Sequence, residues 1–157
     1  MISVLFVCLG NICRSPSAEA VFRSRAQAAG LEVFADSAGT AAWHVGKAPD
    51  KRAQDAGARR GYALSALRAR QVTHRDFERF DFILAMDHEN FAALTSQAPE
   101  AYAGKVHLFL SFAPELGRQA VPDPYYGDDD GFDEVLDLVE AASDGLIRRL
   151  CERRIKI

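Results

Sequence analysis

Residues 2–16, ISVLFVCLGNICRSP, join an apolar run to a glycine-containing turn and then to the start of a helix. The run at 2–7 shows no polar alternation apart from Ser3, which predicts a central strand covered on both faces. Residues 16–29 are predicted as a helix with Ser15 as its N-cap. A strand that breaks into such a turn and opens a helix directs backbone N–H groups toward a bound anion.

The rest of the chain repeats this alternation of strand and helix. The predicted strands are residues 32–36, 82–86 and 106–112, the last mainly in its first half, and the predicted helices are residues 50–60, 73–77, 88–96 and 132–153. This order predicts an α/β fold, an open four-stranded parallel sheet with helices on both faces in a flavodoxin-like, three-layer arrangement. Because no repeat or linker interrupts it, we expect residues 1–157 to form a single domain.

Composition restricts the classes of partner and compartment. The net charge is −3 and 48% of the 157 residues are hydrophobic, so neither nucleic acid nor an anionic membrane is expected as a partner. No apolar run reaches the roughly 18 residues of a membrane span, and no secretory signal is evident. Three cysteines are too few for a disulfide framework, which predicts a cytoplasmic protein. No Cys/His cluster completes a metal site, and we expect neither metal nor cofactor.

Polar residues follow three of the predicted strands. Cys8 follows the first strand, Ser37 lies in a predicted loop at 37–40 after the second, and Asp87 follows the third. Because ligands bind at the carboxyl ends of strands in open parallel sheets, these residues are expected to meet at one site. Asp50 and Asp87 are also predicted to cap the helices that follow them, and Thr73 to form a capping box with Asp76.

Cys8 and Arg14 bracket the turn with five residues between them. A thiolate is a strong nucleophile, and a helix N-terminus beside an arginine favours that form of Cys8. The Arg14 guanidinium offers two parallel donors to a tetrahedral oxyanion. Gly10 is expected to adopt torsions closed to other residues, and Asn11 to brace the turn in a left-handed conformation. Ser15 is expected to donate its hydroxyl to the Cys8 sulfur.

Asp123 lies between Pro122 and Pro124, in a turn that continues through Tyr125 and Tyr126. Hydrolysis of a phosphate ester through a cysteine requires a proton for the leaving oxygen and later a base for water. One carboxyl group can do both. Asp123 is therefore predicted as the general acid and base.

Together, residues 7–16, the segment DSAGT at 36–40, Trp43 and the segment DPYYG at 123–127 resemble the low-molecular-weight protein tyrosine phosphatases. The resemblance runs over nearly the whole chain. It implies Cys8 as nucleophile, Arg14 as phosphate clamp and Asp123 as acid and base. It further implies that Asn11, Ser15 and Ser37 support the loop, and that an aryl slot is walled by Leu9, Ile12, Trp43, Tyr125 and Tyr126.

The resemblance also carries a redox expectation and a departure. Family members use a neighbouring cysteine such as Cys13 to trap the oxidised nucleophile as a reversible disulfide. Many family members carry histidines where this chain has Arg60 and Leu67, and those histidines surround carboxylates such as Asp87. Because this chain lacks them, a site role for Asp87 stays open beside its capping role. We expect a tyrosine-phosphorylated protein as the partner, with a tyrosine kinase as one candidate, and a monomeric enzyme.

Three alternatives remain beside a tyrosine phosphatase. An arsenate reductase would need shuttle cysteines near the third strand, and residues 82–96 contain none. A protein-arginine phosphatase resembles this chain more closely, but carries a smaller polar residue where Ile12 stands. A non-catalytic phosphotyrosine-binding module would not need Cys8, Arg14 and Asp123 together. Outside the site, no role is assigned to His44, His74, His88 and His107. The basic segment 51–79 and the acidic segment 123–137 are predicted to form two solvated faces. The functional alternative is that the basic segment docks acidic phosphopeptides or a partner kinase.

Overall fold

The structure, a computed structural model, describes residues 1–155. Its sheet is parallel throughout, with the strand order β2-β1-β3-β4. The strands are Ile2–Cys8 (β1), Val33–Gly39 (β2), Phe82–Ala85 (β3) and Val106–Leu108 (β4). The predicted open four-stranded parallel sheet is confirmed.

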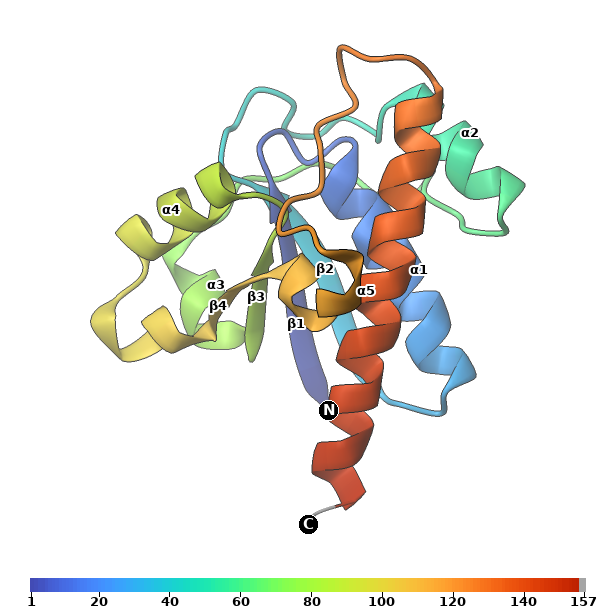
Figure 1. Cartoon of the computed structure of the whole chain (residues 1–157). Coiled ribbons are helices and arrows are strands. Elements are labelled where there is room, and N and C mark those ends of the chain that lie inside the picture. The colour runs from blue at the N-terminus through green and yellow to red at the C-terminus, as the bar shows by residue number, and fades with distance from the viewer. Residues whose placement is uncertain (156–157) are drawn as a thin grey trace.

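Helices cover both faces of this sheet (Figure 1). On one side lie α1 (Arg14–Ala28) and the long α5 (Asp130–Ile155), with α2 (Lys51–Arg59) beside α5. On the other side lie α3 (His74–Arg79) and α4 (His88–Gln97). The three-layer α/β arrangement predicted from the sequence is therefore present.

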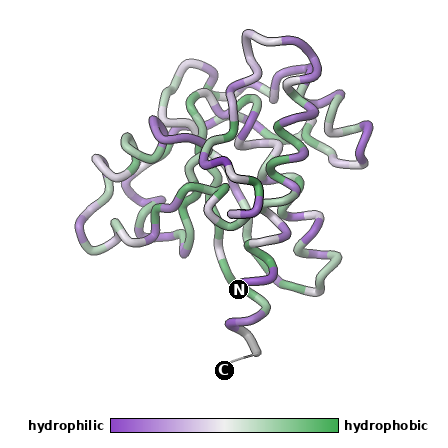
Figure 2. The backbone as a smooth tube through the Cα atoms, in the orientation of Figure 1, coloured by the Kyte–Doolittle hydropathy of each residue, from purple (hydrophilic) through white to green (hydrophobic). Residues whose placement is uncertain are grey.

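The central strand β1 separates two hydrophobic clusters. Successive side chains of a strand point to opposite faces. Val4 and Phe6 join the cluster that includes α1 and α5, whereas Leu5 and Val7 join the cluster that includes α3 and α4. All four side chains are fully buried. Figure 2 shows the same pattern, with hydrophobic residues concentrated along the central strands.

Two element boundaries differ from the sequence prediction near the site. Strand β2 extends through Ser37 to Gly39, because its pairing with β1 continues as far as Cys8 opposite Gly39. The predicted loop at 37–40 was therefore wrong for its first three residues. A Cβ at Gly39 would lie 2.8 Å from the Leu9 carbonyl oxygen, so this close approach requires glycine. Helix α1 begins at Arg14, and Ser15 is not its cap.

The other helix and strand predictions hold more closely. Asp50 accepts a hydrogen bond from the Arg52 N–H at 2.9 Å, and Asp87 from the Asn90 N–H at 2.8 Å, as expected of caps. The capping box of Thr73 is also present. Strand β4 ends at Leu108 because the chain then turns into the 3₁₀ helix Phe109–Phe112. Two further 3₁₀ helices in the described residues are Glu100–Lys105 and Pro114–Leu116.

The topology gathers the segments that follow β1 and β2, and the segment that precedes α5, at the upper end of the sheet in Figure 1. Strand β1 lies between β2 and β3. The strand that follows β1 in the chain is added on one side of it, and the later strands are added on the other side. Such a switch point is where open parallel sheets bind ligands. None of the helices in the described part of the chain is long and apolar enough to cross a membrane.

Candidate active site

A pocket of about 250 Å³ opens at the carboxyl end of β1. Its walls come from three segments that are far apart in the sequence. The lining residues are Cys8, Leu9, Gly10, Ile12, Cys13, Arg14, Trp43, His44, Asp123, Tyr125 and Tyr126. The structure thus brings the predicted catalytic residues and the predicted aryl slot into one cavity.

The Cys8 side chain is 2% exposed and is surrounded by hydrogen-bonding groups. Its Sγ lies 3.0 Å from Ser15 Oγ and accepts the Asn11 N–H at 3.3 Å. Ser15 Oγ in turn accepts a hydrogen bond from Asn11 Nδ2 at 2.8 Å, so its own proton is free to point at the sulfur. The Ser15 hydroxyl thus contacts the sulfur, and Ser15 is not the cap of α1 because the helix begins one residue earlier, at Arg14.

Arg14 is 3% exposed and lies among oxygen acceptors. Its Nη1 donates to Asp87 Oδ2 at 2.6 Å and to the Val121 carbonyl oxygen at 3.1 Å, while Nη2 lies 3.7 Å from Asp123 Oδ2. Burial opposes the charge, but the negative charges of Cys8, Asp87 and Asp123 raise the pKa of Arg14 above its ordinary value. Asp87 therefore caps α4 and also orients the arginine of the site.

In the Cys8 loop, the residue with a left-handed backbone conformation is Asn11 and not Gly10. Asn11 has φ 58°, the left-handed conformation that was predicted for it. The torsional role predicted for Gly10 was wrong, because its φ is not positive. Space is the constraint there instead, since a Cβ on Gly10 would lie 3.0 Å from His44 Cδ2.

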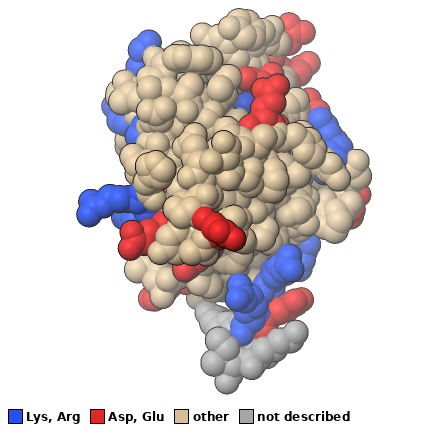
Figure 3. All heavy atoms as spheres, turned by 90° about the vertical axis from the view of Figure 1, so that its left-hand side faces the viewer, with Lys and Arg blue, Asp and Glu red and all other residues tan. Residues whose placement is uncertain are grey.

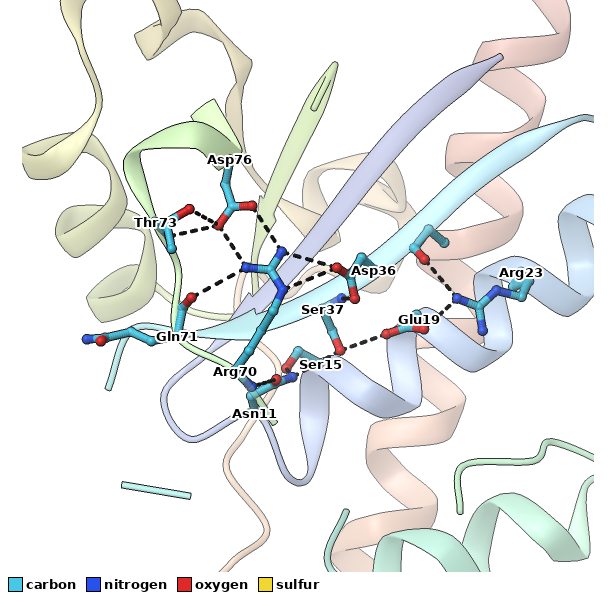
Figure 4. A network of polar contacts seen from close by, with 11 residues as sticks. Asn11, Ser15, Glu19, Arg23, Asp36, Ser37, Arg70, Gln71, Thr73 and Asp76 are labelled. Atoms are coloured by element: carbon cyan, nitrogen blue, oxygen red, sulfur yellow. Dashed lines mark hydrogen bonds and ion pairs between the residues drawn. The ribbon is translucent and has the colours of Figure 1, made fainter. Parts of the chain in front are cut away.

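A buried polar network holds the Asn11 side chain from behind the loop (Figure 4). Asn11 Nδ2 donates to Ser37 Oγ at 3.0 Å, and Ser37 Oγ donates to Glu19 Oε1 at 2.8 Å. Burial raises the pKa of Glu19, although Ser37 and Arg23 partly offset this by binding the carboxylate. The predicted supporting position of Ser37 is thus found within β2.

Arg70 closes the network on its other side. Its backbone N–H donates to Asn11 Oδ1 at 2.9 Å. Its guanidinium pairs with Asp76 at 2.9 Å and with Asp36 at 3.1 Å, which fixes the segment before α3 against β2 (Figure 4). The Cys8 loop is therefore braced by Arg70 and its carboxylate partners. This chain has Arg60 and Leu67 at the positions where family members were expected to have histidines, and the brace uses neither.

Asp123 lies at the mouth of the pocket with its side chain 44% exposed. Its Oδ1 accepts the Tyr125 N–H at 3.1 Å, which leaves Oδ2 directed toward Arg14. Trp43 and Tyr126 are 69% and 95% exposed, and form the rim around the cavity. An exposed aromatic rim above a buried nucleophile suits a flat ring carrying a phosphate.

His44 is a site residue that the sequence analysis missed. It lines the pocket, where it lies against Gly10 and faces the Tyr125 ring at a centroid distance of 6.4 Å. The available signal was its position next to Trp43, which was already assigned to the rim. His74 and His88 are exposed, and His107 is half-buried in β4.

Cys13 is a free thiol at the edge of the pocket and is 5% exposed. Burial raises the pKa of Cys13, and the negative charges of Asp50, Cys8 and Asp123 raise it further. Cys13 is therefore held as a neutral thiol beside the nucleophile. Among the described residues, no group of three or more His, Cys, Asp or Glu side chains is placed to hold a metal ion.

Comparison with known proteins decides the family. The family model described as low molecular weight phosphotyrosine protein phosphatase matches residues 3–156. The chain belongs to this family. A low molecular weight protein-tyrosine-phosphatase of Streptomyces coelicolor is 50% identical over 155 residues, covering 96% of this chain and 94% of the relative.

Solved structures of this phosphatase family confirm the fold. A protein tyrosine phosphatase from Entamoeba histolytica, crystallised with Hepes in the active site, superposes with a TM-score of 0.94 at 42% identity and covers 98% of this chain and 99% of the other. YfkJ from Bacillus subtilis gives 0.91 at 42% identity, with 98% and 96% covered. The predicted class, a cysteine-dependent phosphatase of the low-molecular-weight type, is confirmed.

Proposed function

We propose that this protein hydrolyses phosphotyrosine in proteins through a cysteinyl-phosphate intermediate. The observation that carries the proposal is that Cys8, Arg14 and Asp123 line one aromatic-rimmed pocket, with Arg14 in contact with both Asp87 and Asp123. Nucleophile, clamp and acid are thereby within reach of one phosphoryl group.

In the first step the Cys8 thiolate attacks phosphorus. The S–P bond forms as the bond to the phenolic oxygen breaks, and Asp123 gives its proton to that oxygen. Arg14 holds two oxygens of the phosphoryl group as their charge develops. In the second step Asp123 takes a proton from water, which attacks phosphorus and releases inorganic phosphate. Ser15 donates to the Cys8 sulfur and stabilises it as it leaves.

The pocket walls support an aryl substrate. Leu9 and Ile12 lie on the loop that carries Cys8, and Trp43, Tyr125 and Tyr126 stand at the opening. Because Cys8 lies at the bottom of this cavity, the short side chain of phosphoserine does not carry its phosphate to the sulfur. The apolar Ile12 side chain favours an aromatic ring over a guanidinium, which supports phosphotyrosine over phosphoarginine.

Turnover of a matched peptide panel carrying phosphotyrosine, phosphoarginine or phosphoserine tests the proposal. Phosphotyrosine is expected to be hydrolysed fastest. Cys8→Ser should abolish turnover while retaining binding, and Asp123→Asn should lower the rate by about 10²–10⁴-fold. Faster turnover of phosphoarginine would replace the substrate assignment, and wild-type turnover by Cys8→Ser would overturn the mechanism.

We also propose that Cys13 protects Cys8 against oxidation. Peroxide converts the Cys8 thiolate to a sulfenic acid, and Cys13 then attacks that sulfur to form a disulfide and release water. The sulfenic acid is neutral, so its formation removes one of the charges that raise the pKa of Cys13. Activity lost to peroxide should return with added thiol in the wild type but not in Cys13→Ala. Equal recovery in both proteins would contradict this role.

The proposed partner is a tyrosine-phosphorylated protein in the cytoplasm, with a tyrosine kinase as one candidate. The nucleophile, the clamp and the acid meet in the pocket of a single chain, so the proposed reaction needs no residue from a second copy of the protein. Substrate trapping with Cys8→Ser, followed by release with inorganic phosphate, would identify the bound phosphoprotein.

A further inference from the structure

The segment that carries Asp123 has few attachments to the rest of the protein. We define the acid loop as residues 123–127, Asp-Pro-Tyr-Tyr-Gly. Two of its hydrogen bonds are internal, from the Tyr125 N–H to Asp123 Oδ1 and from the Gly127 N–H to the Pro124 carbonyl oxygen. In residues 1–155, the hydrogen bonds that reach the acid loop from outside are both donated by Arg52, and the ion pair of Arg14 with Asp123 at 3.7 Å is a further attachment.

The Arg52 guanidinium donates hydrogen bonds to two backbone carbonyl oxygens of the acid loop. Its Nη2 donates to the Tyr125 carbonyl oxygen at 2.9 Å, and its Nη1 to the Gly127 carbonyl oxygen at 3.5 Å. The same group lies 5.8 Å from the centre of the Tyr125 ring and 4.6 Å from that of Phe132. Arg52 therefore contacts the acid loop through two carbonyl oxygens and the Tyr125 ring, and it also packs against Phe132 of α5.

Arg52 is itself fixed to the loop that holds the nucleophile. Its Nε and Nη2 donate to the two oxygens of Asp50, at 3.1 Å and 3.0 Å. These hydrogen bonds hold the pKa of Asp50 below its ordinary value. The Asp50 N–H donates to the Ile12 carbonyl oxygen at 2.8 Å. A continuous set of contacts thus runs from the Cys8 loop through Asp50 and Arg52 to the acid loop.

We propose that Arg52 is a positioning residue that sets the place of Asp123 relative to Cys8. It touches neither phosphorus nor the leaving oxygen, and acts through the backbone of the acid loop. This inference rests on the proposed function, in which Asp123 protonates the leaving group. Lysine carries its three donors on one nitrogen, whereas the planar fork of arginine spreads its donors over Asp50 and the two carbonyl oxygens, so lysine is expected to keep only part of these contacts.

A misplaced acid affects substrates unequally, and this gives the test. A strongly acidic phenol can leave as its phenolate with little help from a general acid. Unsubstituted phenol is a poorer leaving group, and its oxygen must be protonated as the bond to phosphorus breaks. We would measure kcat/KM for 2,4-dinitrophenyl, 4-nitrophenyl and phenyl phosphate, because this constant reports the steps through formation of the phosphoenzyme. The variants are Arg52→Ala, Arg52→Lys, Asp123→Asn and the double variant Arg52→Ala/Asp123→Asn.

Arg52→Ala is expected to lower kcat/KM for phenyl phosphate by about 10-fold or more, since small displacements of a catalytic group are costly. For 2,4-dinitrophenyl phosphate the loss should stay below about 3-fold, because that leaving group needs little help. Arg52→Lys should remain closer to Arg52→Ala than to the wild type. In the Asp123→Asn background, removing Arg52 should cause almost no further loss.

Arg59→Ala is the matched control, because Arg59 lies on the same helix and pairs with Asp133 rather than with the acid loop. It should leave all three constants unchanged. An equal loss by Arg52→Ala across the three substrates, no loss, or full activity of Arg52→Lys would overturn the positioning role.

The two proposals fail in different ways. If Asp123→Asn shows no dependence on the leaving group, the acid assignment in the proposed function is wrong. If Asp123→Asn shows that dependence and Arg52→Ala does not, only the inference about Arg52 is wrong.

Discussion

Asn11 joins backbone conformation, packing and chemistry in a single residue. It is 3% exposed, has φ 58° and contacts Cys8, Ser15, Ser37 and Arg70. The sequence predicted its left-handed backbone, since asparagine tolerates that region. It also predicted that Asn11 braces the loop, but not that its side-chain amide donates to the Ser15 hydroxyl, which serves the nucleophile.

Replacing Asn11 separates these two contributions. Asn11→Ala leaves buried partners unsatisfied and places alanine in a left-handed conformation, so we expect the free energy of unfolding to fall by about 2–4 kcal/mol. Asn11→Gly loses the same hydrogen bonds without the strain, and should be more stable than Asn11→Ala by about 1 kcal/mol. Urea unfolding measures both. Equal stability of the two variants would show that the φ of Asn11 carries no strain.

Cys13 should resist alkylation in the folded protein. Burial raises its pKa and the carboxylates of Asp50 and Asp123 raise it further, so at pH 8 it remains a protonated thiol, which is the unreactive form. Iodoacetamide should modify Cys8 and leave Cys13 intact, as located by fragmentation of the labelled peptide. Cys8→Ser is the control, in which Cys13 should be labelled in urea but not under native conditions. Native labelling of Cys13 in that variant would contradict its burial.

At the scale of elements, the sequence predicted order and type well but local boundaries less well. The apolar run at 2–7 predicts a central strand because both of its faces are hydrophobic, and the alternation of strands with helices along the chain predicts a parallel sheet. Ser37 was assigned to a loop because polar and small residues weaken a strand pattern. In the structure, pairing with β1 makes Ser37 part of strand β2. A local sequence pattern does not show which strand a segment pairs with.

The candidate site shows the same division. Cys8, Arg14 and Asp123 could be predicted because each residue type is required by the chemistry. Arg52 and His44 could not, since their roles depend on which loops meet across the sheet. An arginine on a predicted helix has no distinctive local signal, and the position of His44 next to Trp43 does not by itself show that its ring lines the pocket.

Strand β4 contains a titratable group whose effect on stability can be measured. His107 packs against the rings of Phe82 and Phe112, at centroid distances of 6.2 Å and 6.0 Å. Burial lowers the pKa of His107, and the positive charge of Arg149 lowers it further. The folded state therefore binds a proton less readily than the unfolded chain, whose histidines titrate near pH ~6.5.

Stability should consequently fall as the pH drops below about 6.5, where the unfolded chain takes up a proton that folded His107 does not. His107→Gln removes this titration. We expect the loss of unfolding free energy between pH 7.5 and 5.5 to be smaller in His107→Gln than in the wild type. His74→Gln, at an exposed position, is the control and should retain the wild-type dependence. An unchanged pH dependence in His107→Gln would rule out this source.

Charge is distributed over the whole molecule differently from the sequence prediction of two solvated faces. Charged side chains are sparse over much of the face that carries α4 (Figure 3). The basic α2 and the acidic start of α5 instead lie together, with Arg59 and Arg60 paired to Asp133 and Arg60 also to Asp137. Arg59 and Arg60 already have acidic partners, and docking of acidic phosphopeptides or of a partner kinase on the basic segment 51–79 stays a prediction.

The pairing between α2 and α5 converges on Glu140, which is 20% exposed. Its Oε1 accepts from Arg60 at 2.7 Å, and its Oε2 from Tyr62 at 2.6 Å and from Arg25 at 3.0 Å. One carboxylate thus joins α1, the end of α2 and α5. A network of this kind stabilises more than a single exposed pair, because fewer side chains must be ordered for each contact.

A double-mutant cycle on Arg60 and Glu140 tests this connection between elements. We expect Arg60→Ala to lower the free energy of unfolding by about 1 kcal/mol, and the coupling with Glu140→Gln to be about 0.5–1 kcal/mol. Lys51→Ala breaks a pair with Asp55 that is highly exposed and local to α2, so it should lower stability by less than about 0.5 kcal/mol. Salt at about 1 M should reduce the Arg60 effect only partly, because the partly buried pair is less screened than the exposed one. Coupling near zero between Arg60 and Glu140 would mean that apolar packing, and not charge, holds α2 against α5.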